Sequence, residues 1–270
     1  MENQHAKAAA SRNTHPVHVK NIVKLFNELR HRHDLYRVFS DCMEMMALAL
    51  SNAVDKTQFE EREARYMQII KPYTRDELTC FSKILAETQI ALGTSPGDLL
   101  GAVFGELEVH NKHRGQFFTP YEICTLMARM QVGDGERMRA IIADNGFVTV
   151  SEPACGAGAM VIAFAEAMID AGFNPCSSVH VTAVDVDSRA AHMAYVQLSL
   201  MGIPAVVIVG NTLTLEEREH FYTPAHVLGG WRRRLGMVPG RKWLTTTSTS
   251  AEPVSASAAS LPELPQLQLF

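Results

Sequence analysis

The feature that most constrains this chain is a strand-like run that ends in an acidic residue and a glycine turn. The run from Phe147 to Ser151 passes directly into Glu152-Pro153-Ala154-Cys155-Gly156-Ala157-Gly158, and a helical pattern follows over 158–171. Two glycines one residue apart allow a sharp turn and let a ligand approach the backbone closely. The N–H groups at the start of the helix then face that ligand. The pattern predicts a strand, a ligand-binding loop and a helix.

The same alternation continues along the chain. Strand-like runs recur from His180 to Asp185 and from Ala205 to Val209, with a helical run at 188–201 between them. Strands that alternate with helices predict a parallel sheet with right-handed crossovers. The charged run from Leu215 to Phe221 is predicted to form a short helix.

The residues before this α/β region have a different pattern. Apolar side chains recur every three or four residues over 17–110, which predicts an all-helical domain. Helix starts within it are marked by capping boxes or by a cap before proline. The three signals are Thr57 with Glu60, Thr74 with Glu77, and Ser95-Pro96.

The remaining boundaries follow from composition. The polar residues 1–16 are predicted to form a flexible arm, and 111–244 to form the α/β domain. Residues 245–270 contain no Lys or Arg and are rich in Ser, Thr, Ala and Pro. Because such a segment buries little apolar surface, we expect a disordered tail.

The overall composition excludes several classes of protein. Hydrophobic residues make up 47% of the chain and the formal net charge is -4, which excludes a fibrous or wholly disordered protein. The five cysteines include no C-x-x-C pair, so neither a disulfide framework nor a metal site is expected. No run approaches the roughly 18 apolar residues of a membrane span, and no secretory signal is present. We expect a cytoplasmic protein with no membrane partner.

The residues around the glycine turn point to one cofactor. Position 161 is Val, so the third glycine of a dinucleotide fingerprint is missing. The carboxylate of Glu152 suits a cationic amine, and Asp185, at the end of the next strand, suits ribose hydroxyls. Acid, Gly-x-Gly and distal acid in this order predict S-adenosyl-L-methionine. Cys155 is interpreted as a small packed residue of the loop.

Four runs in this order resemble the N6-adenine DNA methyltransferases, especially the methylation subunits of type I restriction-modification systems. They are GQFFTPYEICTLMARM, SEPACGAGAMVIAFAEAM, VTAVDVDSRAAHMAYVQLSLMGI and GNTL, and the similarity covers about residues 100–215. The resemblance implies a Rossmann-like S-adenosylmethionine-dependent methyltransferase sheet preceded by an all-helical domain. It also implies double-stranded DNA as substrate and, as partner, either a specificity subunit or a second chain that completes the active site.

The resemblance implies a set of cofactor-binding residues. An extra N-terminal motif would fold over the methionine end of the cofactor. The glycine loop would lie against the cofactor, and the residue after the third strand would lie near the adenine ring. The matching positions are Phe118, Thr119, Pro120, Glu152, Ala154, Gly156, Gly158, Asp185 and Asn211. Two alternatives stay open: Thr119 as a helix cap and Asn211 as a turn residue.

The chain departs from this family in one motif. Adenine methyltransferases carry Asp/Asn-Pro-Pro-aromatic, which accepts hydrogen bonds from the target amino group of a flipped base. None of the twelve prolines here are adjacent, and Asn174-Pro175-Cys176 precedes the second strand, where it cannot face the methyl donor. At about 30 residues per βαβ unit, the sheet is expected to be incomplete beside the family's seven strands. The catalytic residues are therefore unknown, and methylation needs a substitute acceptor or a second chain.

A basic cluster follows the predicted sheet. The sequence has no acid between Glu219 and Glu252, and two tryptophans accompany the basic residues. The candidate DNA-binding residues are Arg232, Arg233, Arg234, Arg241 and Lys242. Such a cluster can neutralise phosphates and stack bases; the alternative is a basic surface helix or a partner-docking segment.

Three functions remain open from the sequence. The first is a DNA N6-adenine methyltransferase. The second is a catalytically inactive relative that binds cofactor or DNA and regulates, or interferes with, a restriction-modification system. The third is a small-molecule or protein methyltransferase, which leaves the FFTP element and the helical domain unexplained.

Overall fold

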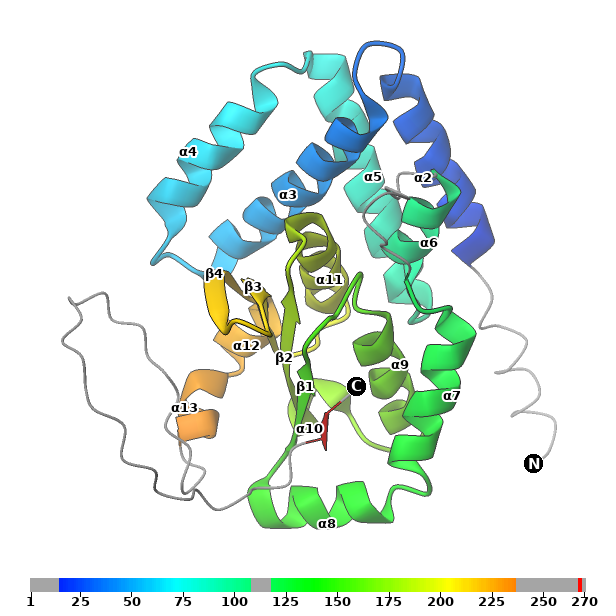
Figure 1. The fold of residues 1–270 in the computed structure, drawn as a ribbon, viewed down its shortest axis with the longest axis vertical. Helices are drawn as coiled ribbons and strands as arrows, with labels where there is room; N and C mark the ends of the chain where they lie inside the picture. Colours follow the sequence, from blue (N-terminus) through cyan, green and yellow to red (C-terminus); the bar gives the residue numbers. More distant parts are fainter. Residues whose placement is uncertain (1–14, 108–117, 237–266, 269–270) are drawn as a thin grey trace.

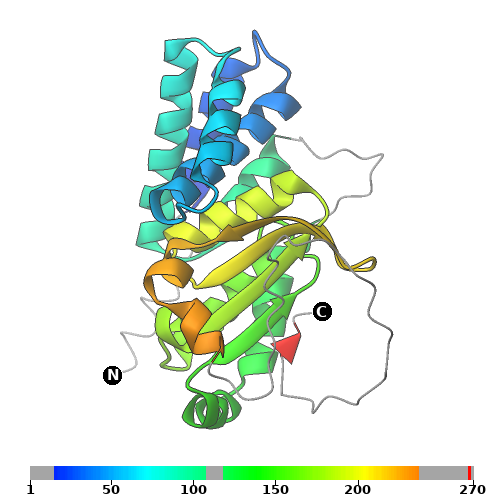
Figure 2. The same cartoon turned by 90° about the vertical axis from the view of Figure 1, so that its left-hand side faces the viewer.

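The computed structural model describes residues 15–107, 118–236 and 267–268. Helices make up its first part, in agreement with the periodicity of the sequence, and they gather at one end of the molecule (Figures 1 and 2). They are α2 (His15–Leu29), α3 (Leu35–Val54), α4 (Phe59–Ile70), α5 (Arg75–Thr94) and α6 (Leu99–Glu106). The flexible arm predicted over 1–16 lies outside the described residues up to position 14, and its last two residues belong to α2.

One of the two predicted capping boxes forms. The Thr74 hydroxyl accepts from the Glu77 N–H, and the Glu77 carboxylate accepts from the Thr74 N–H at 2.7 Å. The box predicted at Thr57 is wrong: its hydroxyl donates to the Asp55 carboxylate at 2.6 Å, and α4 begins at Phe59 without a side-chain cap. The Thr57 hydroxyl is therefore hydrogen-bonded to the Asp55 carboxylate and does not cap the helix.

The described strands are five in number and form one sheet in the order β4-β3-β2-β1-β5. The first three strands pair in parallel through the crossover helices α9 (Ala159–Asp170) and α11 (Ser188–Leu200), which confirms the predicted α/β alternation. Strand β4 is antiparallel to β3, and β5 is parallel to β1. The strands are β1 (Val148–Glu152), β2 (Val179–Asp185), β3 (Ala205–Asn211), β4 (Glu216–Tyr222) and β5 (Leu267–Gln268).

One sequence prediction about the sheet is wrong, and a second can be compared with the structure at two residues only. The short helix predicted from Leu215 to Phe221 is the edge strand β4, because Phe221 is buried against α11 while the backbone pairs with β3. The disordered tail predicted over 245–270 contains β5, whose two residues pair with β1. The rest of that tail lies outside the described residues.

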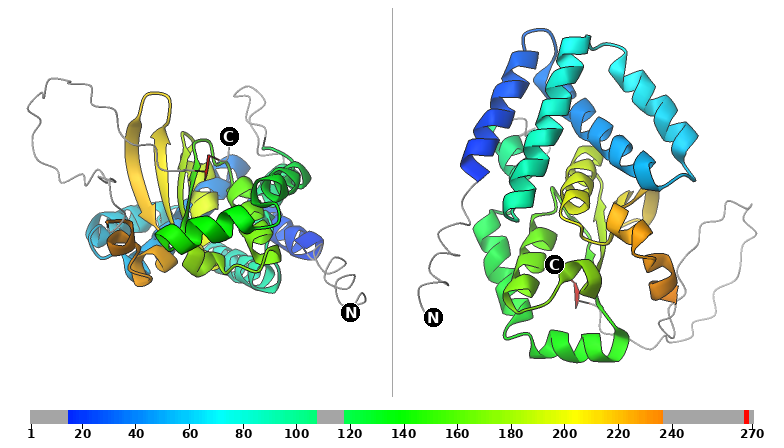
Figure 3. Two further views of the ribbon diagram at one scale, coloured as in Figure 1. Left: turned by 90° about the horizontal axis from the view of Figure 1, so that it is seen from below. Right: turned by 180° about the vertical axis from the view of Figure 1, so that it is seen from behind.

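Shorter helices surround the sheet. Helix α7 packs on the outer side of α9, and α11 packs between the sheet and α3, so one continuous core joins the helical and α/β parts (Figures 1 and 3). These helices are α7 (Tyr121–Val132), α8 (Glu136–Asn145), α10 (Pro175–Ser178), α12 (Pro224–Leu228) and α13 (Trp231–Gly236). None of the described helices is long and apolar enough to cross a membrane.

A buried arginine joins α4 to the edge of the sheet. Arg62 donates to the Asp55 carboxylate at 3.0 Å, to the Ser51 hydroxyl, and to the His220 carbonyl of β4 at 2.7 Å. Its guanidinium also lies 4.9 Å from the centre of the Phe221 ring. A buried charge is tolerated only when it is paired and hydrogen-bonded, so this cluster fixes where the helices meet β4.

Replacing this arginine tests the junction. We expect Arg62→Met to lower the free energy of unfolding by about 3–5 kcal/mol, because it leaves Asp55 buried without its partner charge. The matched control is Arg65→Met on the same helix, whose ion pair with Glu44 is half-exposed; we expect it to cost less than about 1 kcal/mol. Urea denaturation of both variants measures the difference, and equal losses would contradict the assigned role.

Candidate functional site

The loop between β1 and α9, residues 153–158, has the backbone that the two glycines predict. Gly156 has φ +55° and Gly158 has φ +96°, both in the left-handed region that favours glycine. Gly158 also caps α9, and the Cys155 N–H donates to the Val184 carbonyl of β2 at 2.8 Å. The burial of Cys155 agrees with its interpretation as a packed residue. We call this segment the glycine loop.

Phe118, the second phenylalanine of the FFTP element, lies against the glycine loop. A Cβ added to Gly156 would come within 3.1 Å of the Phe118 ring, which packs in turn on Phe104 of α6 with 5.1 Å between ring centres. Thr119 and Pro120 are exposed beside it. Pro120 is the N-cap residue of α7 and no side-chain cap bond forms, so the helix-cap interpretation of Thr119 is wrong.

Glu152 ends β1 directly before the loop and is only 3% exposed. One carboxylate oxygen accepts from the Ala154 N–H at 3.2 Å, and Oε2 is buried with no hydrogen-bond partner among the described residues. Burial raises the pKa of the Glu152 carboxyl to about 7, and the nearby charge of Asp185 adds to the shift. A buried oxygen of this kind fits a cationic or hydrogen-bond-donating ligand.

Asp185 ends β2, and its carboxylate is hydrogen-bonded to the glycine loop. Its Oδ2 accepts from the Gly156 N–H at 2.8 Å and its Oδ1 from the Asp187 N–H at 2.9 Å. Burial raises the pKa of the Asp185 carboxyl, while these backbone donors oppose the shift. Because each carboxylate oxygen has two lone pairs, Asp185 keeps acceptor capacity for hydroxyl groups.

Asn211 ends β3 and shapes the turn that follows. Its Oδ1 accepts from the Leu213 N–H at 3.0 Å and from the Thr214 N–H at 3.4 Å, which confirms the turn-residue alternative. The next residue, Thr212, donates its hydroxyl to the Pro153 carbonyl of the glycine loop at 2.6 Å. The carboxyl ends of three parallel strands therefore meet at one edge of the sheet.

A buried amide that sequence reasoning missed supports the glycine loop from below. Gln197 of α11 donates to the Ala157 carbonyl at 2.8 Å and to the Asp98 carboxylate at 2.9 Å, and accepts from the Leu100 N–H at 3.0 Å. Asp98 is the N-cap residue of α6. The helix start predicted at Ser95-Pro96 is therefore wrong, and Ser95 instead caps the end of α5. No motif marks Gln197, since its partners are distant in sequence.

The basic cluster does not join these residues. Trp231 is buried against Phe147 and His180, which precede or begin strands, so the cluster lies at the opposite edge of the sheet and Trp231 cannot stack on a base. The Arg234 guanidinium lies 3.6 Å from the centre of the Trp231 ring and donates to the Ser177 carbonyl. Arg232 and Arg233 are exposed, whereas Arg241 and Lys242 lie outside the described residues.

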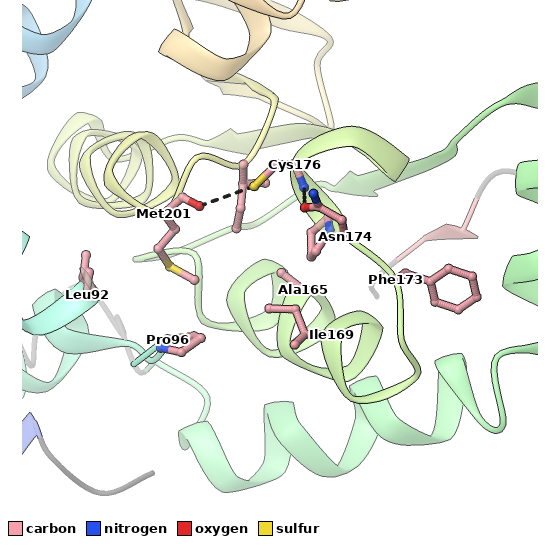
Figure 4. Close-up of a pocket in the computed structure, with 10 residues that line it drawn as sticks. Leu92, Pro96, Ala165, Ile169, Phe173, Asn174, Cys176 and Met201 are labelled. Atoms are coloured by element: carbon pink, nitrogen blue, oxygen red, sulfur yellow. Dashed lines mark hydrogen bonds between the residues drawn. The ribbon is translucent and has the colours of Figure 1, made fainter. Parts of the chain in front are cut away.

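The Asn174-Pro175-Cys176 segment, which partly resembles the acceptor motif, also lies away from the glycine loop. Asn174 caps α10 before β2, accepting from the Cys176 N–H at 3.1 Å, and borders an apolar cavity of about 340 Å³ (Figure 4). The cavity is lined by Leu92, Pro96, Ala165, Ile169, Phe173, Asn174, Pro175, Cys176, Met201 and Ile203. Within the described part of the chain, no three potential metal ligands gather.

The buried carboxyl of Glu152 is expected to make the free energy of unfolding depend on pH. Its folded-state pKa, about 7, lies above the ordinary 4.5, so the folded protein holds this proton more tightly. Stability from this group is complete below pH 4.5 and is lost as the pH rises through 7. We expect Glu152→Gln to stabilise the protein at pH 8 by up to about 3 kcal/mol relative to its effect at pH 4.5. Chemical denaturation at both pH values measures this; an effect that does not change with pH would contradict the buried ionisation.

Comparisons with known proteins find one family model that is similar to the part of the chain that holds this site. Residues 97–229, which include every candidate cofactor residue, match the model of the N-6 DNA methylase family. Two solved structures are similar in part. A protein from Listeria monocytogenes, described as a class I S-adenosylmethionine-dependent methyltransferase, has 14% identity and a TM-score of 0.37, covering 80% of this chain and 69% of its own. A type I restriction-modification system methyltransferase subunit from Streptococcus thermophilus has 13% identity and a TM-score of 0.33, covering 71% of this chain and 57% of its own.

No functionally curated protein matches this chain significantly. The family match spans α6, the glycine loop and the carboxyl ends of β1, β2 and β3, which are the elements that build the site. Residues 97–229, just under half of the chain, are thus similar to the N-6 DNA methylase family.

Proposed function

We propose that the glycine loop binds S-adenosyl-L-methionine and that the chain takes part in N6-adenine methylation of double-stranded DNA. The observation that carries the proposal is the buried Oε2 of Glu152, which has no hydrogen-bond partner in the described part of the chain and lies beside a Gly-x-Gly turn. The methionine ammonium supplies the cation that this oxygen lacks. The family match supports the methyl acceptor.

The residues divide the cofactor among them. Glu152 would hold the ammonium, the backbone of Ala154, Gly156 and Gly158 would lie along the methionine, and Asp185 would accept from the ribose hydroxyls. Phe118, Thr119 and Pro120 would cover the methionine end, and Asn211 would border the adenine. When bound, the cofactor supplies an electrophilic methyl group for in-line displacement. The protein contributes positioning, because a methyl transfer of this kind needs an aligned acceptor more than a covalent intermediate.

Filling the glycine loop tests the cofactor site. We expect Gly156→Asp to weaken binding of S-adenosylhomocysteine by at least about 100-fold, or about 2.7 kcal/mol, because it adds volume against Phe118 and an anion beside Asp185. The control is Gly172→Asp at the other end of α9, where the glycine also has a left-handed φ, +86°, and open space around it. Titration calorimetry compares the two variants, and unchanged affinity in Gly156→Asp would contradict the site.

The reaction is tested separately. Purified protein is incubated with labelled S-adenosylmethionine and unmethylated duplex DNA, with and without a type I specificity subunit, and the nucleosides are analysed. We expect N6-methyladenine, and we expect Gly156→Asp to abolish it. If the protein binds the cofactor but transfers no methyl group either with or without the specificity subunit, methylation by this chain is overturned.

The second candidate is a catalytically inactive relative that binds the cofactor and regulates or interferes with a restriction-modification system. The absence of adjacent prolines from the whole sequence favours it, because the family's acceptor motif is then missing. Cofactor binding without methyl transfer is the result that this candidate predicts.

A further inference from the structure

Helix α7 carries an apolar stripe on the side that faces away from α9. Ile123, Leu126 and Met130 follow each other at three- and four-residue spacing and are 46%, 57% and 75% exposed. The opposite side of the helix is buried through Cys124 and Ala128. Among the described elements, α9 is the one that packs extensively on α7 (Figures 1 and 3). A stripe with this period on an exposed helix is typical of a helix-pairing surface.

Two opposite charges border the stripe on one side. Glu122 and Arg129 are both exposed and are seven residues apart, so they lie on the same side of the helix, two turns from each other. Arg129 forms an ion pair with Asp170 of α9 at 3.6 Å, and its side chain remains 56% exposed. With Ile123 and Met130 at position a and Leu126 at position d of a heptad, both charges occupy position g.

This pattern is complementary to itself in one orientation. If two copies of α7 pair antiparallel about a twofold axis, position g faces position g of the partner. Glu122 of each copy then lies opposite Arg129 of the other, and the two apolar stripes cover each other. In parallel pairing position g would face position e of the partner, here Met127, so neither charge would meet an opposite one. The charge pattern therefore selects a second copy of this chain in the antiparallel orientation.

We propose that the protein forms a twofold-symmetric dimer through an antiparallel pair of α7 helices. A helix of 12 residues is about 18 Å long, so the contact is small and the dimer depends on concentration. The proposal does not rest on cofactor binding or on methyl transfer.

Charge reversal on the full-length chain gives a sharp test. We expect sedimentation velocity to show the mass rising from 29.8 kDa towards twice that value as the concentration increases. Glu122→Arg and Arg129→Glu should each be monomeric, because each homodimer would oppose like charges at two places. An equimolar mixture of the two variants should dimerise again, since both opposing pairs are then of opposite charge.

Two further variants separate this interface from other surfaces. Leu126→Glu should abolish the dimer, whereas Ile90→Glu should not, although Ile90 of α5 is equally exposed at 57%. Circular dichroism verifies that each variant is folded. A wild-type protein that stays monomeric at every concentration overturns the proposal. So does a dimer that survives both charge reversals, or a mixture that does not recover it.

Discussion

The candidate site depends on the side chain of Gln197. Its amide group uses both hydrogens and its oxygen at once, joining the glycine loop at Ala157, the carboxylate of Asp98 and the first turn of α6. Because the amide is fully buried, losing any of these partners would leave a polar atom unsatisfied in the core. The glycine loop therefore cannot shift without displacing α6.

That constraint extends to the cover of the loop. Phe104 of α6 packs on Phe118, and Phe118 lies over Gly156. The same helix thus holds the loop through Gln197 and its cover through Phe104. Helix α6 is consequently a component of the site, and the family match, which begins at residue 97, includes this helix but not α2 to α5.

Sequence periodicity predicted the elements whose causes are local. The strands β1, β2 and β3, their crossover helices and the left-handed glycines follow from alternation and from backbone sterics, which act within a few residues. The errors have tertiary causes. Thr57 was captured by Asp55, and the charged run of β4 became a strand because Arg62 and Phe221 fix it to the sheet edge. Partners nearly a hundred residues apart, such as Gln197 and Asp98, leave no signal in a single sequence.

Glu152 lowers the stability of the folded protein and is also the residue proposed to bind the ammonium group. Its burial beside Asp185 raises its pKa, so the ionised form is disfavoured until a cation is present. A glutamine there would be more stable near neutral pH but would offer no charge to an ammonium. Binding sites commonly hold such unfavourable groups at the expense of stability.

The same strand ends limit how a methyl acceptor can be oriented. Asn211 uses its Oδ1 to close the turn, and both oxygens of Asp185 are engaged by backbone N–H groups. Glu152 would be occupied by the ammonium of the cofactor. Each of these three side chains thus already has a role, and the lone pairs that Asp185 retains are those proposed to accept from the ribose hydroxyls. A hydrogen-bond acceptor for the adenine amino group is therefore expected from another part of the chain or from a second protein. A specificity subunit is one protein that could supply this contact.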